Sequence, residues 1–327
     1  MSRRGGAFSV TALALAVGLA SALAAGPVWG AFSSKAAVTG SSSITAAADF
    51  RAPEATATVI AKTTGGRGGY IKKSGTYYIY ANVTDSGSPA SGVSTVKANV
   101  GTITSGQTAV TLSVGTFTVD GVSYNRRSAS LTAGSGIVAG LLGYSLTLTD
   151  VAGNSQTESG FSVTVDNTVP AAADIQTANG GAIAGRADIG DKITFTYSEE
   201  PDPNSILAGW SGAATNVVVR LNQVTANDTV TIYNSTNATL LPLGTINLGR
   251  TDYTTANRTF GATGTASTME LSGNQVFVTL GTQSGAATTA AATGSMIWTP
   301  SATVTDPAGN ATSTTTKTES GAADKEF

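Results

Sequence analysis

From residue 52 onward, short stretches of the chain alternate between apolar and polar side chains. In YYIYANVT, residues 77–84, one side of the chain carries Tyr77, Ile79, Ala81 and Val83, and the other carries Tyr78, Tyr80, Asn82 and Thr84. Strands with one buried and one solvent-facing side produce this period of two. The same pattern predicts further strands at residues 109–114, 144–149, 161–166, 193–198, 217–221, 229–233, 276–280 and 296–300.

Turn-forming residues separate these strands, as an antiparallel β-sandwich requires. Pro170 interrupts the pattern, since proline cannot donate to a sheet, and residues 166–172 are interpreted as a linker. We therefore predict an all-β chain of two sandwich domains with little helix. The expected ranges are 52–168 for the first domain, 169–316 for the second and 317–327 for a polar tail. A helical turn is expected only near 203–210, and an irregular stretch at 234–268.

A six-residue pattern, T-D-x-A-G-N, occurs twice, 156 residues apart. Glycine adopts positive φ without penalty, the Asp side chain can accept from turn amides, and Asn tolerates left-handed geometry. The motif therefore predicts a tight structural turn in the final hairpin of each domain, after strands at 144–149 and 301–305. The residues after the second copy lack apolar alternation, so this copy is expected to be the weaker one. The predicted turn residues are Asp150, Gly153, Asn154, Asp306, Gly309 and Asn310.

These segments resemble bacterial Ig-like modules. TDVAGNSQTESGFSVTVDNTVPAA, residues 149–172, is similar to the last hairpin and linker of such a module. VTDSGSPASGVSTVKANVG, residues 83–101, resembles an early strand-turn-strand, and GDKITFTYSEEPDPNSI, residues 190–206, is similar to another segment of the group. The resemblance covers about residues 52–316. It implies two tandem Ig-like antiparallel β-sandwich domains in a secreted protein of a Gram-positive, actinobacterial-type organism.

The first 30 residues have the features of an export signal. Arg3 and Arg4 supply a positive start, residues 7–25 are uncharged and mostly apolar, and cleavage is expected after Ala24 or Gly30. The alternative is an uncleaved anchor, because the stretch nearly reaches the ~20 residues that a membrane span needs. Residues 31–51 would then form an N-terminal extension. We expect an exported protein, extracellular or on the cell surface, that contacts the membrane only through an uncleaved segment.

The amino-acid composition excludes several kinds of catalytic and metal site. The chain has neither Cys nor His, so it has no disulfide framework, no Cys–His pair, no His base for a Ser triad and no His/Cys zinc cluster. Only 12% of residues are charged and the net charge is −2, which provides no basic surface for nucleic acid. Apolar residues make up 41% of the chain, enough to build a core.

Carboxylates are the remaining candidates for chemistry. Glu199, Glu200 and Asp202 form the densest group, and oxygen donors on a turn suit Ca²⁺, so they are a candidate calcium site. The alternative is a solvated loop, because the regular spacing of a calcium loop is missing. Asp166 and Asn167 in the linker are a second calcium candidate, although turn formation alone also explains them. No other cofactor is expected.

Two functional hypotheses remain. The first is a non-enzymatic structural or interaction protein, spacer or adhesin-like, whose partner is a surface protein or a glycan. The second is a secreted carbohydrate-binding or carbohydrate-active protein that uses carboxylates of the second domain. Trp210 and Trp298 bear on this choice, because they are either core residues or an exposed sugar-binding platform.

Overall fold

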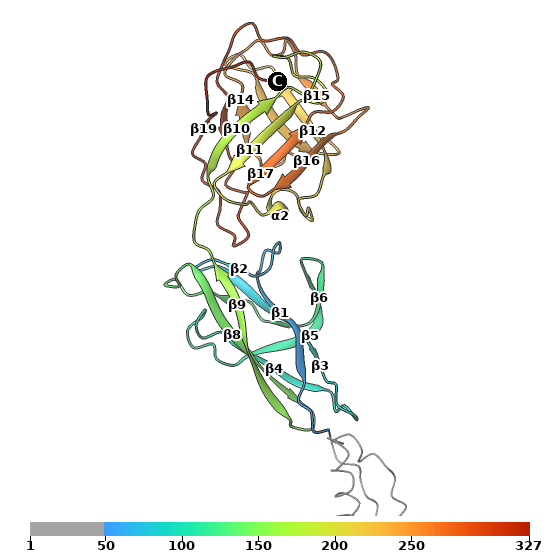
Figure 1. Cartoon of the computed structure of the whole chain (residues 1–327), viewed down its shortest axis with the longest axis vertical. Coiled ribbons are helices and arrows are strands. Elements are labelled where there is room, and N and C mark those ends of the chain that lie inside the picture. The colour runs from blue at the N-terminus through green and yellow to red at the C-terminus, as the bar shows by residue number, and fades with distance from the viewer. Residues whose placement is uncertain (1–48) are drawn as a thin grey trace, which may run out of the picture. The chain divides into compact units, whose positions relative to one another are not determined.

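The structure is a computed structural model that describes residues 49–327 (Figure 1). These residues form two β-sheets and, apart from the strands, a single four-residue helix. The prediction of an all-β chain is therefore confirmed. The predicted export signal, residues 1–30, and the extension up to residue 48 lie outside the described residues.

The first sheet contains nine strands in the order β1-β3-β6-β5-β4-β8-β9-β2, with β7 paired to β3. β2 runs parallel to β9, whereas β3 pairs antiparallel with β6 and β7, and β5 pairs antiparallel with β4 and β6. The strands are β1 (Glu54–Lys62), β2 (Tyr70–Ile71), β3 (Thr76–Thr84), β4 (Val93–Asn99), β5 (Val110–Val119), β6 (Val122–Ser128), β7 (Leu131–Thr132), β8 (Gly140–Asp150) and β9 (Ser155–Val165).

The second sheet contains ten strands in the order β10-β11-β17-β16-β12-β13-β14-β18-β19, with β15 paired to β12. All of its strand pairs are antiparallel. The strands are β10 (Ala172–Ala178), β11 (Lys192–Tyr197), β12 (Thr215–Asn222), β13 (Thr229–Asn234), β14 (Thr245–Asn247), β15 (Arg258–Phe260), β16 (Ser267–Ser272), β17 (Gln275–Thr279), β18 (Ile297–Thr299) and β19 (Lys317–Thr318).

The second sheet curls until its last strand meets its first. β19 lies against β10, and the Asp174 carboxylate of β10 accepts hydrogen bonds from the amide and the hydroxyl of Ser320, each at 2.8 Å. The apolar faces of the strands therefore enclose one continuous core. In β11 the alternation predicted from sequence places Ile193, Phe195 and Tyr197 in this core, and each is at most 1% exposed.

The first sheet buries its own apolar face. Tyr77 and Ile79 of β3 and Leu146 and Leu148 of β8 are all fully buried. β3 and β8 are strands predicted from period-two alternation, and burial follows that period in β8. In β3 the predicted apolar side is buried, but Tyr80 of the opposite side is buried as well, against the rings of Phe117 and Tyr124. The hydrophobic pattern therefore fixes which face of each strand points inward, because a shift of one residue would expose the apolar set.

The one helix in the described part of the chain, α2 (Pro203–Ile206), falls within the predicted helical segment. Asp202 caps it by accepting a hydrogen bond from the Asn204 amide at 3.0 Å, and proline stands at its first position. Leu207 returns to an extended conformation and ends the helix after one turn.

Three segments differ from their predictions. The stretch 234–268, expected to be irregular, contains β14, β15 and the start of β16. Residues 301–305, expected to be a strand, contribute only an isolated bridge from Thr305 to Ala311. The expected polar tail, 317–327, contains β19 and ends in Phe327, which is 4% exposed and contacts the Tyr253 ring edge-on at 6.2 Å. Short strands with few apolar residues carry too weak a periodic signal to be recognised.

Residue contacts divide the described chain into two units. The smaller comprises residues 49–54, 84–94 and 148–156, and the larger comprises 55–83, 95–147 and 157–327. The smaller unit contains the first D-x-A-G-N turn, and the larger contains the second. Across residues 49–327, no helix has the length and apolar character that crossing a bilayer requires.

Candidate functional site

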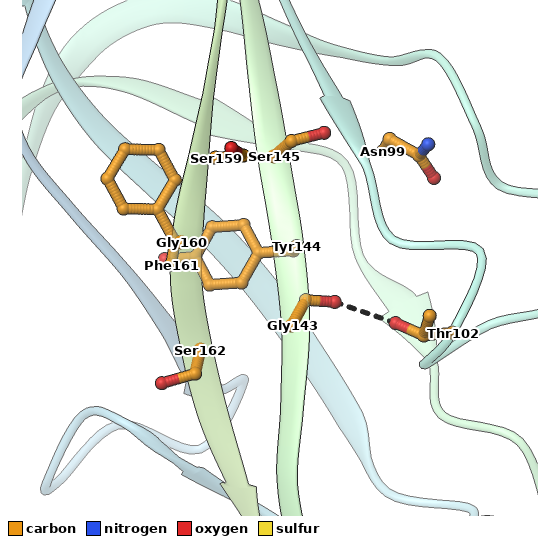
Figure 2. A pocket seen from close by; sticks show the side chains of 9 residues that line it. All are labelled: Asn99, Thr102, Gly143, Tyr144, Ser145, Ser159, Gly160, Phe161 and Ser162. Atoms are coloured by element: carbon orange, nitrogen blue, oxygen red, sulfur yellow. Dashed lines mark hydrogen bonds between the residues drawn. The ribbon is translucent and has the colours of Figure 1, made fainter.

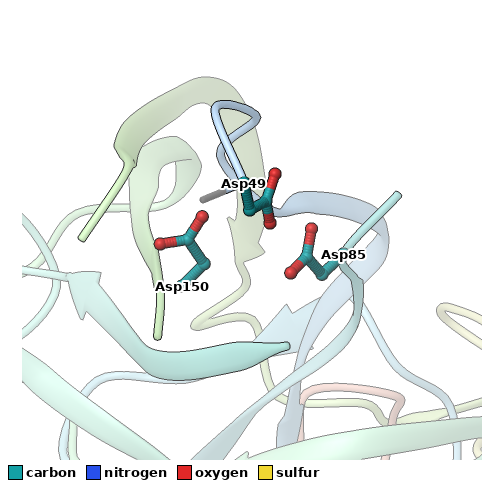
Figure 3. Close-up of side chains that lie close together, drawn as sticks. All are labelled: Asp49, Asp85 and Asp150. Carbon is teal, nitrogen blue, oxygen red and sulfur yellow. The ribbon is translucent and has the colours of Figure 1, made fainter. Parts of the chain in front are cut away.

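Three carboxylates come together in the smaller unit. Asp49 precedes β1, Asp85 directly follows β3 and Asp150 ends β8, and one oxygen from each lies within 4.8 Å of the other two (Figure 3). Asp49 is 6% exposed and Asp150 is 2% exposed. Segments far apart in sequence thus bring three acidic side chains to one point.

Backbone amides hold two of these side chains in place. Asp49 accepts from the amides of Arg51 and Ser91, each at 2.9 Å, and Asp85 accepts from two amides of the loop that follows it. The amide hydrogen bonds lower the pKa of Asp49, so its carboxyl group stays ionised at neutral pH.

The first D-x-A-G-N motif positions Asp150, the third carboxylate of this cluster. The two Asp150 oxygens accept from the backbone amide and the side-chain amide of Asn154, each at 2.7 Å. The Asn154 side chain also donates to the backbone carbonyl of Asp49 at 2.7 Å. Gly153 adopts φ of 95°, a conformation that glycine reaches without penalty. The motif is a turn, and the same turn ties β8 to the residues before β1.

The second motif repeats this arrangement. The two Asp306 oxygens accept from the backbone amide and side-chain amide of Asn310, each at 2.7 Å, and the Asn310 side chain donates to the carbonyl of Asp166 at 3.0 Å. Gly309 adopts φ of 92°. The second copy is the more deeply buried one, because Asn310 is 7% exposed whereas Asn154 is half-buried. The second copy was expected to be the weaker one because the sequence after it is polar. That polar sequence carries no information about how deeply the turn itself is buried.

A second acidic cluster surrounds the second motif. Asp166 precedes β10, Glu199 follows β11 and Asp306 lies in the turn, and one oxygen from each lies within 4.8 Å of the others. Each member has a counterpart in the first cluster: one before the first strand, one after an early strand and one in the D-x-A-G-N turn. The two clusters therefore have the same construction.

None of the ion pairs among the described residues includes a carboxylate of the second cluster. Two ammonium groups contact the backbone of its turn: Lys62 donates to the carbonyl of Asp306 at 3.1 Å and Lys72 to that of Gly309 at 2.5 Å.

Glu199 Oε1 is inaccessible to solvent and has no hydrogen-bond partner. Burial, together with the charges of Asp166 and Asp306, raises the pKa of Glu199 to about 7. Burial also raises the pKa of Asp306, against the hydrogen bonds from Asn310 that lower it. A bound cation would favour the ionised form of all three groups.

The predicted calcium group Glu199, Glu200 and Asp202 is dispersed. Glu199 belongs to the cluster just described. Glu200 forms an exposed ion pair with Arg67 at 2.9 Å, which contributes little to stability. Asp202 is 1% exposed and pairs with the Lys62 ammonium, besides capping α2. The three residues are close in sequence, but their side chains contact different partners and do not converge on one point. Of the linker pair, Asp166 joins the cluster, whereas Asn167 accepts from the amide of Lys73.

Trp210 and Trp298 do not form a platform for sugars. Trp210 is 7% exposed and Trp298 is fully buried. Their indole N–H groups donate to the carbonyls of Ala213 and Leu243 at 2.6 and 2.7 Å. The core interpretation of these residues is therefore the correct one.

A shallow hollow on the first sheet contains no chemical site. It is bordered by the rings of Tyr144 and Phe161, whose centroids are 5.5 Å apart, and otherwise by Ser, Thr, Asn and Gly residues (Figure 2). Tyr144 is its one titratable residue, and burial raises its pKa to about 12. The lining therefore offers no pair of groups that could act as acid and base at neutral pH.

Comparison with known proteins supplies no relative. No protein-family model matches the chain, and a search of curated proteins finds no match either.

Proposed function

We propose that the chain is an exported, non-enzymatic structural and interaction protein, spacer or adhesin-like, built from tandem Ig-like β-sandwich modules that bind Ca²⁺ at their acidic clusters. The observation that carries this proposal is the duplication: Asp49, Asp85 and Asp150 recur as Asp166, Glu199 and Asp306. Each cluster joins the entry of a sheet to its D-x-A-G-N turn, which is where a cation would stiffen a module.

The donor set supports calcium. Ca²⁺ binds carboxylate, carbonyl and water oxygens at about 2.3–2.6 Å, so two ligands of one ion lie at most about 5 Å apart. The carboxylate oxygens of each cluster lie within 4.8 Å of one another, which meets this limit. Smaller Mg²⁺ demands bonds near 2.1 Å and a near-ideal octahedron, a narrower requirement that favours calcium as the occupant.

Export rests on the N-terminal sequence. Arg3, Arg4 and the apolar residues 7–25 are typical of a signal peptide, and extracellular calcium concentrations suit sites of modest affinity. The partner would be another surface protein or a glycan. A glycan array separates an adhesin that binds sugar from a spacer that does not.

The competing function is a carbohydrate-active enzyme. Glu199, with a pKa of about 7, and Asp166 are the pair that such an enzyme would use. Retaining glycosidases separate their two carboxyl groups by about 5–5.5 Å and inverting ones by more. Glu199, Asp166 and Asp306 each place one oxygen within 4.8 Å of the other two. Three converging carboxylate oxygens suit a single bound ion, whereas a glycosidase needs a pair of carboxyl groups on the two sides of a sugar bond.

Hydrolysis assays test the choice between the two. The wild-type protein, incubated with common polysaccharides, is expected to release no more reducing sugar than Glu199→Gln. Glu270→Gln, which changes an exposed carboxylate outside the clusters, is the matched control. Release of sugar by the wild type and by Glu270→Gln, together with its loss in Glu199→Gln, would support the enzyme instead.

A further inference from the structure

A third acidic cluster lies in the segment that follows β18. Glu319 comes directly after β19, and Asp324 and Glu326 lie close to Phe327. One oxygen from each of the three carboxylates lies within 4.8 Å of the others. This cluster contains no D-x-A-G-N motif and shares no residue with the two described above.

Glu326 is the most deeply buried member of this cluster, and one of its two carboxylate oxygens has no hydrogen-bond partner. It is 1% exposed, and Oε2 accepts from the Thr177 hydroxyl at 2.7 Å. Oε1 is shielded from solvent and has no hydrogen-bond partner, and the same is true of Glu319 Oε1. None of the four ion pairs found among residues 49–327 includes a residue of this cluster. Burying an ionised carboxylate with an unpaired oxygen is costly unless a cation accompanies it.

The cluster lies where the segment is attached to the second sheet. The Glu326 amide donates to the Tyr253 hydroxyl at 2.7 Å, and the carbonyl of Phe327 accepts from the Gly185 amide at 2.6 Å. Asp324 is exposed, and its carbonyl accepts from the Gly294 amide at 2.8 Å. An ion held by the three carboxylates would therefore join β19, the buried end of the segment and the loops they contact.

We propose that Glu319, Asp324 and Glu326 bind a divalent cation of the Ca²⁺ type, which fastens residues 317–327 to the second sheet. The spacing of the oxygens fits one ion with bonds of about 2.3–2.6 Å. The exposed Asp324 side leaves access for the ion and for the water molecules that complete its coordination. The Oε1 atoms of Glu319 and Glu326, which have no hydrogen-bond donor within reach, then gain a partner without either group taking up a proton.

A shared proton is the competing account of this cluster. Burial raises the pKa of Glu326, so Glu319 and Glu326 could instead hold one proton between them. The two accounts differ in their response to calcium, because a proton-linked pair needs no metal. They differ also in their response to Glu326→Gln, because an amide mimics a protonated carboxyl group but is a poor replacement for a charged ligand.

Hydrogen exchange of the full chain with and without Ca²⁺ decides between them. When Ca²⁺ exceeds its dissociation constant tenfold, exchange in residues 317–327 is expected to slow by about tenfold, since binding suppresses local opening by that factor. Glu326→Gln should abolish this slowing while preserving any calcium effect at the Asp306 turn. The exposed Glu270→Gln should retain both effects. Asp324→Asn provides the same test at an exposed position, where loss of folding is not expected.

Two results would overturn the proposal. One is exchange in residues 317–327 that calcium leaves unchanged in the wild type. The other is slow exchange in Glu326→Gln without calcium, equal to that of the calcium-loaded wild type, which would assign the cluster to a shared proton. Because the readout is confined to this segment, failure here is distinguishable from failure of calcium binding at the other two clusters.

Discussion

Replacing Asp306 by alanine is expected to lower the free energy of unfolding of the second sheet by about 2–4 kcal/mol. The Asp306 carboxylate is fully buried and accepts from the backbone amide and the side-chain amide of Asn310 at 2.7 Å. Alanine removes both acceptors, and Asn310 is only 7% exposed, so water replaces them poorly. Calorimetry in excess chelator measures the loss, expected as a melting temperature lower by about 5–15 °C.

The first copy of the motif supplies the matched variant. Asp150→Ala removes the same two acceptors from Asn154, but Asn154 is only half-buried, so water can take the place of the carboxylate. We expect a smaller loss, about 1–2 kcal/mol. Asp306→Asn keeps one acceptor oxygen in a side chain of similar shape, so its loss in the free energy of unfolding should be smaller than that of Asp306→Ala. Equal losses for the two alanine variants would contradict the role of burial, and no loss in either would contradict the stabilising role of the turn.

Trp298→Ala is expected to be similarly damaging, with a loss of about 3–5 kcal/mol. The indole is fully buried in β18 and contacts Phe195 and Tyr197 edge-on, with ring centroids 5.2 and 4.9 Å away. Its N–H donates to the Leu243 carbonyl at 2.7 Å. Alanine leaves a cavity in the core and an unpaired carbonyl. Urea unfolding, followed by far-ultraviolet circular dichroism, measures the loss.

Trp298→Phe separates the two contributions. Phenylalanine fills most of the cavity but cannot donate to Leu243, so we expect only the cost of the lost hydrogen bond and of the smaller ring, about 1–3 kcal/mol. A Trp298→Ala protein that unfolds at the wild-type urea concentration would contradict the position of this residue at the centre of the core.

Strand periodicity predicted the all-β fold and located several of the longer strands, but it missed β1, which has nine residues, and β6, which has seven. β3 and β11 were located from alternation alone, and their predicted apolar residues are buried. β14 and β15, with three residues each, are too short to alternate recognisably, and residue 317 begins a two-residue strand in a polar context. The burial of Phe327 depends on Tyr253, a contact between distant segments that no local pattern encodes.

The acidic clusters could be predicted only in part. The D-x-A-G-N motif identified Asp150 and Asp306, because turn chemistry is local. Asp49 and Asp85 remained unrecognised, since each is an isolated acid in sequence and only strand pairing brings them to Asp150. A signal did exist: Asp49 and Asp166 each stand a few residues before the first strand of a sheet. This shared position relative to β1 and β10 is the feature of the sequence that marks Asp49 as the counterpart of Asp166.

Counting bound calcium by equilibrium dialysis tests the duplicated clusters most directly. We expect the number of ions bound per chain to fall by one in Asp150→Asn, by one in Asp306→Asn and by two in the double variant, because each change removes a charged ligand from one cluster. Calcium that the double variant still binds should disappear when Glu326→Gln is added. Equal binding by the wild type and the double variant, or no binding by the wild type, would contradict the account.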